Sequence, residues 1–572
     1  MKIKNIVLSS LLLGSISLVG CGGGDSDINN DDINQNINND DANENDNPNI
    51  TTDNCTKVTD HIVEDSIWSA SCYKVSIDLD IDAQLTIKEG TKVYFDVGRN
   101  MRIDDGKLIA IGTAEKPIIF TSEEETRGYW DGLSFYGASS NQNELTHIIV
   151  EYAKIGLEVT SVGSEVSRLS VSDSTFRENS EYGFKFNSTA ILDKFENIHS
   201  YDNAISGYTY ANSLYPLGEE SDFSGNDKDY IEVYGDIISK KQTWNALNVP
   251  VLLTHSVEID SDLTINAGAS FLCDSGISMR IDDGTLEAIG TKTEPIIFTA
   301  NQKTKGYWEG IHFYTSDNIK NILSYVHISY ATTALKVSGA GTTITRLKVN
   351  DSNLSYNENY GFSFDNLSSI DDFSNMLVYE NDTVGQATAN NIYRLDANSL
   401  FAGNTNDYIE ISSYALTKEH TWNALTVPIL FTKQTDIDAF LTIKAGASFL
   451  FDVDAGLRID DGALTAIGTE AKPITFTGKQ QTTGYWDSIN FYGSQDTRNK
   501  MSYVELSYGG RESYGLLMLS GSDSTLELSN ATIGYSGGYG IDTVCKGVIV
   551  MDNVSYEENT LADFYRPDNC SS

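Results

Sequence analysis

Short stretches of alternating apolar and polar residues recur along most of the chain, each opened by a glycine. The strings Gly-Lys-Leu-Ile-Ala, Gly-Leu-Ser-Phe, Gly-Leu-Glu-Val and Gly-Phe-Lys-Phe begin at Gly106, Gly132, Gly156 and Gly183. Alternation with a period of two is typical of a half-buried β-strand, and glycine marks the turn before it. No sustained 3.6-residue apolar period appears, so we predict an all-β protein.

A second, longer repeat has a period of about 178 residues. A Gly-Tyr-Trp string and the string Arg-Ile-Asp-Asp-Gly each recur at that spacing, with the tryptophans at Trp130, Trp308 and Trp486 and the second string at 102–106, 280–284 and 458–462. Fixed-period self-similarity indicates a repeat architecture, and roughly 25 residues per inner unit suits one coil of a β-solenoid. We expect three tandem units, at about residues 66–242, 243–420 and 421–572.

These strings resemble right-handed parallel β-helix proteins with the pectate-lyase-like fold. The resemblance rests on Leu85-Thr-Ile-Lys-Glu-Gly, Leu108-Ile-Ala-Ile-Gly-Thr and Pro117-Ile-Ile-Phe-Thr, followed by Gly-Tyr-Trp-Asp-Gly-Leu-Ser-Phe. It implies a parallel β-helix over residues 55–572, with about seven coils per unit and roughly twenty in all. Because this fold hosts lyases, hydrolases and adhesins, it implies no particular function.

The first 20 residues have the pattern of an export signal. Lys2 and Lys4 precede an apolar run that is too short to span a bilayer as a mature helix. The run ends in Leu18-Val-Gly-Cys21, which resembles the lipobox of bacterial lipoproteins. That resemblance implies cleavage before Cys21 and lipid on the new N-terminus. Gly22, rather than Asp, then favours the outer membrane; an ordinary signal peptide with an incidental cysteine is the alternative.

Residues 21–54 are predicted to be a lipid-bearing, disordered tether. The stretch 25–50 holds 7 Asp and 10 Asn with almost nothing apolar, so it cannot bury enough surface to offset the entropy of ordering its backbone. An Asp/Asn run can also suggest calcium, but this one lacks the alternating ligands and fixed glycine of a calcium loop. We therefore expect a solvated spacer between the membrane and the folded part.

The charge balance excludes one class of partner. Acidic residues outnumber basic ones by 81 to 39, for a formal net charge of −42. Nucleic acid needs clustered Lys and Arg to displace its counterions, so we expect no nucleic-acid partner. The same balance argues against binding an anionic membrane surface through charge, and leaves the N-terminal lipid as the predicted membrane contact.

The cysteines stand where an exported rod needs them. Cys55 and Cys72 are close together at the start of the predicted β-helix, and Cys545 and Cys570 at its end. The open ends of a solenoid must be capped, so we predict one disulfide within each pair. Cys273 aligns with a phenylalanine of the other two units and is expected in the core; no zinc spacing occurs.

Paired acids are the first candidate chemistry. Three pairs could be taken for the carboxylates of a polysaccharide hydrolase, namely Asp104-Asp105, Asp282-Asp283 and Asp460-Asp461. Each precedes a glycine, and Asp-Gly is a turn signal through left-handed backbone geometry and side-chain capping. An active site also occurs once per chain, whereas these pairs occur three times. We interpret them as structural turns, with catalysis or a repeated cation site as alternatives.

Aromatic and acidic surfaces are the other candidates. The Gly-Tyr-Trp strings and the acid after each could form three sugar-stacking platforms, at Tyr129, Trp130 and Asp131, at Tyr307, Trp308 and Glu309, and at Tyr485, Trp486 and Asp487. Packing within the coil is the alternative. Outward acids that alternate with apolar residues suit calcium or a solvated face, and they stand at Asp80 and Asp82, Glu258 and Asp260, and Asp436 and Asp438. No catalytic residue and no metal ligand is assigned.

The sequence thus predicts an exported, lipid-anchored β-helix of the outer membrane, with a binding, adhesive or structural role. Three equivalent faces would make binding multivalent, with polysaccharide or a cell-surface protein as partner. No cofactor is required, and calcium stays open. A surface polysaccharide-degrading enzyme, a lyase or glycoside hydrolase, is the alternative, which a unique acidic groove with a basic residue would favour. A passive spacer is the third interpretation.

Overall fold

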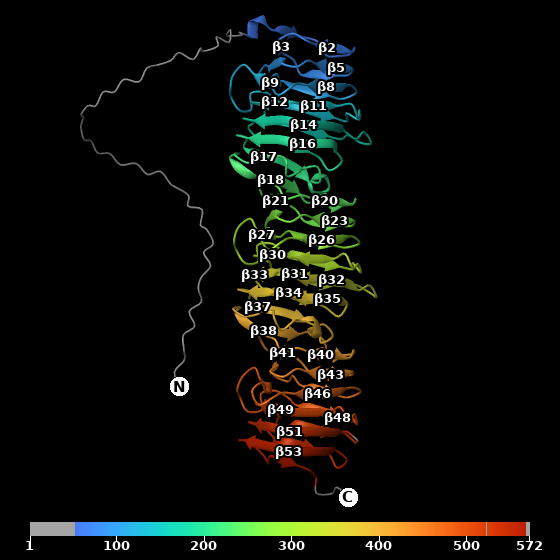
Figure 1. Ribbon diagram of the computed structural model, residues 1–572, viewed down its shortest axis with the longest axis vertical. Coiled ribbons are helices and arrows are strands. Elements are labelled where there is room, and N and C mark those ends of the chain that lie inside the picture. The colour runs from blue at the N-terminus through green and yellow to red at the C-terminus, as the bar shows by residue number, and fades with distance from the viewer. Residues whose placement is uncertain (1–51, 522, 568–572) are drawn as a thin grey trace, which may run out of the picture. The chain divides into compact units, whose positions relative to one another are not determined.

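The structure is a computed structural model that describes residues 52–567 apart from residue 522. Over this part the chain is an all-β parallel β-solenoid of about 21 turns, consistent with a right-handed β-helix. The described residues form 54 strands and three short 3-10 turns, and Figure 1 shows their coils stacked along one axis. The predicted fold class and number of coils are confirmed.

The N-terminal predictions fall outside the described residues. These are the signal peptide, the lipid on Cys21 and all of the tether except residues 52–54, which form the 3-10 turn η1 (Thr52–Asn54). Within the described part of the chain, no helix has the length and apolar character needed to cross a bilayer.

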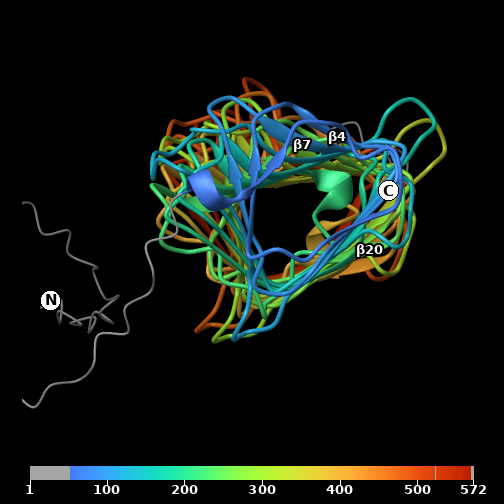
Figure 2. The ribbon, with the colours of Figure 1, turned by 90° about the horizontal axis from the view of Figure 1, so that it is seen from above.

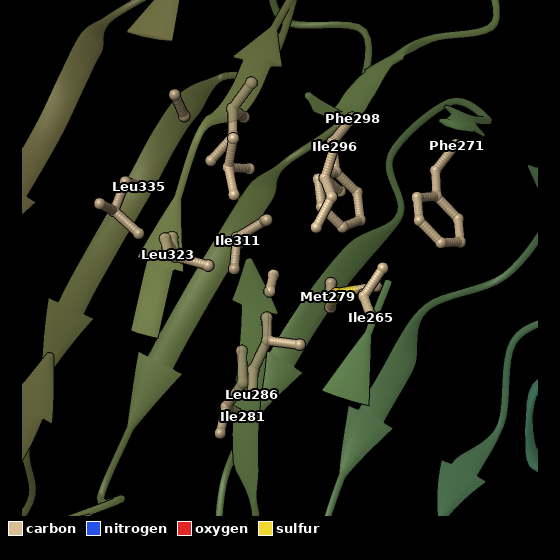
Figure 3. Close-up of a cluster of buried hydrophobic side chains, with 14 of the residues drawn as sticks. Ile265, Phe271, Met279, Ile281, Leu286, Ile296, Phe298, Ile311, Leu323 and Leu335 are labelled. Atoms are coloured by element: carbon tan, nitrogen blue, oxygen red, sulfur yellow. The ribbon is translucent and has the colours of Figure 1, made fainter. Parts of the chain in front are cut away.

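Apolar side chains of successive coils form columns inside the solenoid. β24 (Ser270–Cys273) pairs in parallel with β27 (Ile296–Ala300), which places Phe271 beside Phe298 with ring centroids 4.8 Å apart. Figure 3 shows both rings among the inward side chains of the neighbouring strands. Each buried Leu, Ile or Phe contributes about 1.5–3 kcal/mol, so this repeated stacking is the main source of stability.

Polar turns are also stacked from coil to coil. Asn179 donates its side-chain N–H to Asn203 Oδ1 at 2.8 Å, and Asn203 donates in turn to Asn226 Oδ1 at 3.0 Å. The same ladder recurs one long period later at Asn357, Asn381 and Asn404. These asparagines belong to none of the motifs predicted from the sequence. Because each amide bonds to the next, polar groups at the turns are buried without loss of hydrogen bonds.

Strands that lie one long period apart belong to different sheets. β7 (Asn100–Ile103) belongs to the 13-stranded sheet, β25 (Ser278–Ile281) to the 17-stranded sheet and β45 (Leu457–Ile459) to the 7-stranded sheet. The sheet of β7 continues through β24, and β25 is the next strand along the chain after β24. β8 (Lys107–Ile111), β26 (Thr285–Ile289) and β46 (Ala463–Ile467), which are one period apart, nevertheless lie on the same side of the solenoid in Figure 1, so the strands are joined into sheets differently from unit to unit.

The disulfide predicted at the N-terminal end is confirmed. Cys55 and Cys72 are bonded, with their Cα atoms 5.0 Å apart. Cys545 is also disulfide-bonded, but its predicted partner Cys570 lies outside the described residues. Cys273 is a free, buried cysteine of the core, as expected. The three-unit division itself stays a prediction.

Candidate functional site

The tryptophans of the predicted sugar platforms are core residues. Trp130 is fully buried, stacks on Phe95 with centroids 4.1 Å apart, and donates its indole N–H to the Glu151 carbonyl at 2.9 Å. Trp308 and Trp486 are equally buried and donate to carbonyls at 2.8 Å. A ring covered on both faces cannot stack on a sugar, so the ligand-binding prediction is wrong for Trp130, Trp308 and Trp486. The alternative of packing within the coil accounts for them.

The residues beside the tryptophans do not form three equal sites. Tyr129, Tyr307 and Tyr485 are half-buried, and the hydroxyls of the last two donate to carboxylates of Asp274 and Asp452 at 2.9 and 2.8 Å. Asp131 and Glu309 are exposed, whereas Asp487 is half-buried. The strands that follow the three motifs belong to three different sheets, and they are β10 (Gly132–Tyr136), β28 (Gly310–Tyr314) and β48 (Ile489–Tyr492).

Each Arg-Ile-Asp-Asp-Gly string begins at the end of a strand and continues into a bend. Its arginine makes two side-chain contacts on the surface of the coil. Arg102 forms an ion pair with Asp104 at 2.5 Å and lies over the Tyr136 ring at 4.2 Å. Arg280 and Arg458 repeat both contacts, with ion pairs of 2.9 and 2.7 Å. These contacts give the repeated acids a structural role.

Glycine is required at the end of this string for a different reason from the one expected. Gly106 does not have the positive φ of the left-handed region, so the expectation of left-handed geometry is wrong. A Cβ at Gly106 would instead lie 2.4 Å from the carbonyl oxygens of Ile81 and Ala83. The close approach of the preceding coil therefore requires glycine.

The outward acids face arginines of the next coil. In the pairing of β4 (Leu79–Ile81) with β7, Asp80 stands opposite Arg102, and Glu258 and Asp436 stand opposite the equivalent arginines. Opposite charges across adjacent strands stabilise the sheet. In residues 52–567 without residue 522, no group of three or more His, Cys, Asp or Glu side chains is placed to hold a metal ion, and calcium stays a prediction without a site.

The structure reveals a pocket of about 520 Å³ beside β20 (Gln242–Trp244), here called the amide pocket. Its walls come from the start of β16 (Ile191–Tyr201), from η2 (Ala211–Ser213) and from the chain leading into β20. The lining residues are Val166, Ser188, Thr189, Ala190, Ile191, Asn212, Ser213, Tyr215, Ser239, Lys240, Lys241, Gln242, Thr243 and Asn245.

The pocket exists because one coil lacks a strand on this side. The chain forms the 3-10 turn η2 there, and Figure 2 shows the green turn inside the outline of the stacked coils. A turn that is drawn inward leaves the outer surface hollow between the coils above and below it. The periodicity of the sequence does not predict this turn, because a 3-10 helix of three residues is too short to produce a repeating pattern of apolar residues.

The amide of Gln242 gives the pocket its chemistry. This side chain is only 8% exposed, and neither its Nε2 nor its Oε1 has a hydrogen-bond partner among the residues that the structure describes. An unsatisfied buried polar group costs about 1–3 kcal/mol. At the mouth, Lys240 and Lys241 are exposed. Burial, with the charge of Asp193, raises the pKa of Tyr215, so its phenol is neutral at physiological pH.

The equivalent place one long period later is filled. Tyr393 occupies the position of Tyr215 and stacks on His420, which replaces Gln242, with ring centroids 3.9 Å apart. Arg394 lies over the same tyrosine ring at 4.5 Å. The signal for the pocket was therefore in the sequence, as Lys240-Lys241-Gln242 against Lys418-Glu419-His420. The long repeat is recognised by the residues that the units share, whereas the residues of this site differ from one unit to the next.

A second, smaller pocket of about 360 Å³ is lined by acidic residues, an arginine and a tyrosine. It is lined by Asp454, Asp487, Arg511, Glu512 and Tyr514, and is here called the acidic pocket. Arg511 forms an ion pair with Asp454, and burial raises the pKa of Asp487. Of these residues, only Asp487 belongs to a motif predicted from the sequence. Arg511, Glu512 and Tyr514 come from a loop that drifts from the register of the long repeat in the third unit, and Asp454 comes from a separate segment.

A family model described as a pectate-lyase-like β-helix domain matches residues 59–175. No curated protein and no solved structure matches the chain. The matched segment agrees with the fold of the first coils. It ends before β16, η2 and β20, so it includes only Val166 of the residues that line the amide pocket, and it lies far from the acidic pocket in the sequence.

Proposed function

We propose that the protein is an exported β-helix, held in the outer membrane by lipid on Cys21, that binds polysaccharide through the amide pocket. The observation that carries the proposal is this pocket and its unpartnered amide. Its volume of about 520 Å³ falls within the roughly 300–1,000 Å³ of small-molecule sites. Tyr215 supplies an aromatic ring, and Gln242 a group that both donates and accepts, as sugar hydroxyls require.

Binding, rather than cleavage, suits this pocket. Glycoside hydrolysis uses two carboxyl groups on either side of the scissile bond, and the lining of the amide pocket includes no Asp or Glu. We propose one such site per chain. This replaces three equivalent faces, because Trp130, Trp308 and Trp486 are buried.

The test mixes the full chain with a panel of soluble polysaccharides, with and without calcium, and follows both protein and polymer by size-exclusion chromatography. Co-elution of the protein with intact polymer supports the proposal. A Gln242→Leu substitution should then abolish co-elution while the thermal melting curve is retained. If no polymer co-elutes and none is shortened, the protein is a spacer or binds a protein partner, and the proposal fails.

The acidic pocket supports a second candidate function, cleavage of a surface polysaccharide. The specific observation is that Asp487, whose pKa is raised by burial, lines one pocket with Arg511 and Glu512. A carboxyl group with a raised pKa is better suited to general-acid catalysis than an ordinary one. In the same chromatography the polymer would elute later with time, and Asp487→Asn would stop the shortening. Intact polymer at all times excludes this function for the panel tested.

The lipid anchor is tested separately. Replacement Cys21→Ser removes the acylation site, so the protein should move from the membrane fraction to the soluble fraction after cell lysis. Mass spectrometry of the N-terminal peptide should detect acyl chains on the wild-type protein alone. An unmodified wild-type peptide would contradict the anchor and leave the binding proposal intact.

A further inference from the structure

We propose that the C-terminal end of the β-helix is an interface for a second copy of this chain. The contact is made by β53 (Val548–Glu557), which pairs with the same strand of the copy. The two strands run antiparallel about a twofold axis, so the two solenoids meet end to end. The inference goes beyond the proposed function and does not depend on the amide pocket. Three observations carry it, namely an open strand edge, an uncovered core and the self-complementary sequence of β53.

β53 lies at the end of the solenoid with one edge open (Figure 1). On one side it pairs with β51 (Thr525–Gly534), and in the described part of the chain no strand pairs with its other side. β53 has ten residues, whereas the N-terminal coil ends in β1 (Thr56–Val58) and β2 (Ser66–Trp68), of three residues each. A long open edge is a template for pairing with another chain, and very short edge strands prevent such pairing.

The inward side chains of β53 are uncovered core. Met551 lies beside Leu528 of β51, which is fully buried, yet Met551 itself is 41% exposed. Ile549, Val554 and Tyr556 also pack against the core and are only half-buried. Covering such apolar side chains contributes about 25 cal/mol per Å². These four residues of β53, here called the inward residues, therefore present apolar surface to a partner.

The backbone groups of the inward residues point to the open edge. The Val548 N–H donates to the Ser524 carbonyl of the preceding coil at 2.8 Å, and beyond the bend the Glu557 carbonyl accepts from the Tyr535 N–H at 2.8 Å. Val548 and Glu557 therefore point their backbone groups away from the open edge. Because successive residues of a strand point these groups to opposite edges, a partner strand can bond to the inward residues, which alternate with the residues already engaged.

One antiparallel register of β53 with itself satisfies the side chains, the backbone and the bend together. It places Ile549 opposite Tyr556 of the second copy and Met551 opposite Val554 of the second copy. Inward residues then face each other, and each pair exchanges two backbone hydrogen bonds. The bends at Asn553, where φ is 52°, lie next to each other at the twofold axis. A shift by one residue sets inward residues against outward ones, and a shift by two separates the bends.

The charges also fit this register. Lys546 is exposed and lies on the outward face with Val548, diagonally across from Glu557 of the second copy, a separation that long side chains bridge. Asp552 faces Asn553 of the second copy, so no two acids stand directly opposite each other. Because each chain has a formal net charge of −42, side-by-side contact brings acidic faces together, whereas end-to-end contact joins the last coils alone.

The experiment measures the mass and length of the full chain at increasing protein concentration. The chain bears Cys21→Ser so that lipid does not drive association. Light scattering during size-exclusion chromatography should give a mass that rises with concentration and stops at two copies. By small-angle X-ray scattering, the maximum dimension of the dimer should exceed that of one copy by on the order of 100 Å, the length of about 21 turns at ~4.8 Å each.

Adjacent residues of β53 supply matched variants. Met551→Lys places a charge on the inward side, where it reaches water in a single copy and is buried in the pair, so dimerisation should weaken at least about tenfold. Val550 is 61% exposed and outward, so Val550→Lys should leave the dimer intact. Circular dichroism and thermal melting verify that both variants are folded.

Two charge reversals test the register. Lys546→Glu and Glu557→Lys each bring like charges together twice across the twofold interface, so each should weaken dimerisation by roughly fivefold. An equimolar mixture of the two variants should restore it, because both contacts of the mixed pair then join opposite charges. Native mass spectrometry with one isotopically labelled variant measures the mixed pair.

Four results overturn the inference. The first is a chain that stays monomeric at every concentration, and the second is a dimer no longer than one copy, because its chains lie side by side. The third is a mass that rises beyond two copies, because growth is then head to tail. The fourth is a dimer that Met551→Lys does not weaken, which places the interface away from β53. Failure of the mixture to associate overturns the register.

Discussion

Among single residues, Trp130 illustrates how burial decides the role of an aromatic ring. It is enclosed by the coil and packs on Phe95. Truncation Trp130→Ala leaves a cavity that the rigid stack cannot close, and we expect it to cost about 3–5 kcal/mol. Urea unfolding followed by tryptophan fluorescence and far-ultraviolet circular dichroism measures the loss.

Tyr129→Ala is the matched control for this prediction. Its ring is half-buried, so we expect a smaller loss of stability. Polysaccharide binding at the amide pocket should survive both substitutions. Loss of binding in a Trp130→Ala protein of unchanged stability would put this ring in contact with the ligand after all.

His312 couples stability to pH. Its Nε2 lies 2.7 Å from Ser338 Oγ, and burial, together with Lys336 and Arg280, lowers its pKa from 6.5 to about 4. As the pH falls, the unfolded chain therefore takes up the proton before the folded protein does. The stability that the neutral ring contributes is complete above pH 6.5 and is lost as the pH falls towards 4.

The third unit provides the substitution that tests this. Asn490 takes the place of His312 and accepts a hydrogen bond from Ser520 at 2.6 Å, so His312→Asn should keep the bond to Ser338 without a titrating ring. We expect the variant to lose less stability between pH 6.5 and 4, by on the order of 1 kcal/mol. Identical pH profiles from thermal melting would contradict the assignment.

Among the strands and turns, the first coils depend on a covalent link. The disulfide joins Cys55 to Cys72 in β3 (Cys72–Val75) and closes a loop with a sequence separation of 17. Removing it by Cys55→Ser with Cys72→Ser should cost about 3 kcal/mol. Because each coil contacts only its neighbours, the cost should fall on the adjacent strands alone.

Amide hydrogen exchange with mass spectrometry locates that effect. Protection should drop in β1 (Thr56–Val58) and β3 and stay unchanged in β49 (Lys500–Ser507), far along the solenoid. The remaining cysteine in this region, Cys273, is buried and bears no disulfide, so the two substitutions leave its bonding unchanged. Uniform loss of protection along the chain would show that the solenoid unfolds as one unit.

Over the β-helix as a whole, the coils of the long repeat stack along one axis. The tryptophans that recur once per period are buried, so they present no repeated aromatic face to a polymer that lies along the solenoid. Duplication here extends the solenoid. It does not line up copies of a binding face, and a single pocket that differs from its equivalent suits that geometry better than avidity does.

Deletion of one period tests the predicted units. Removing residues 243–420 joins Gln242 to Thr421 and restores the string Gln-Thr-Trp-Asn-Ala-Leu across the junction. We expect a folded protein whose β-helix is shorter by about 34 Å, from seven coils of ~4.8 Å each. Circular dichroism and a cooperative thermal melt measure folding. Removal of residues 243–400 instead breaks the register and should give an aggregated protein; equal behaviour of both deletions would contradict the tandem units.

Local patterns along the chain were enough to predict the architecture and much of the core. Period-two alternation after each glycine predicted the stacked strands, and the position of Cys273 in that alternation predicted its burial, because alternation is a local property of the chain. The Cys55–Cys72 pairing followed for the same reason, since both residues stand close together at the N-terminal end of the solenoid.

Contacts between coils could not be predicted in this way and came from the folded structure. Burial of Trp130 depends on Phe95 from another strand, and the amide pocket depends on Gln242, Tyr215 and Ile191, which belong to different coils. These contacts join residues of different coils, whose alignment is affected by local irregularities such as η2. A local sequence pattern therefore does not predict them.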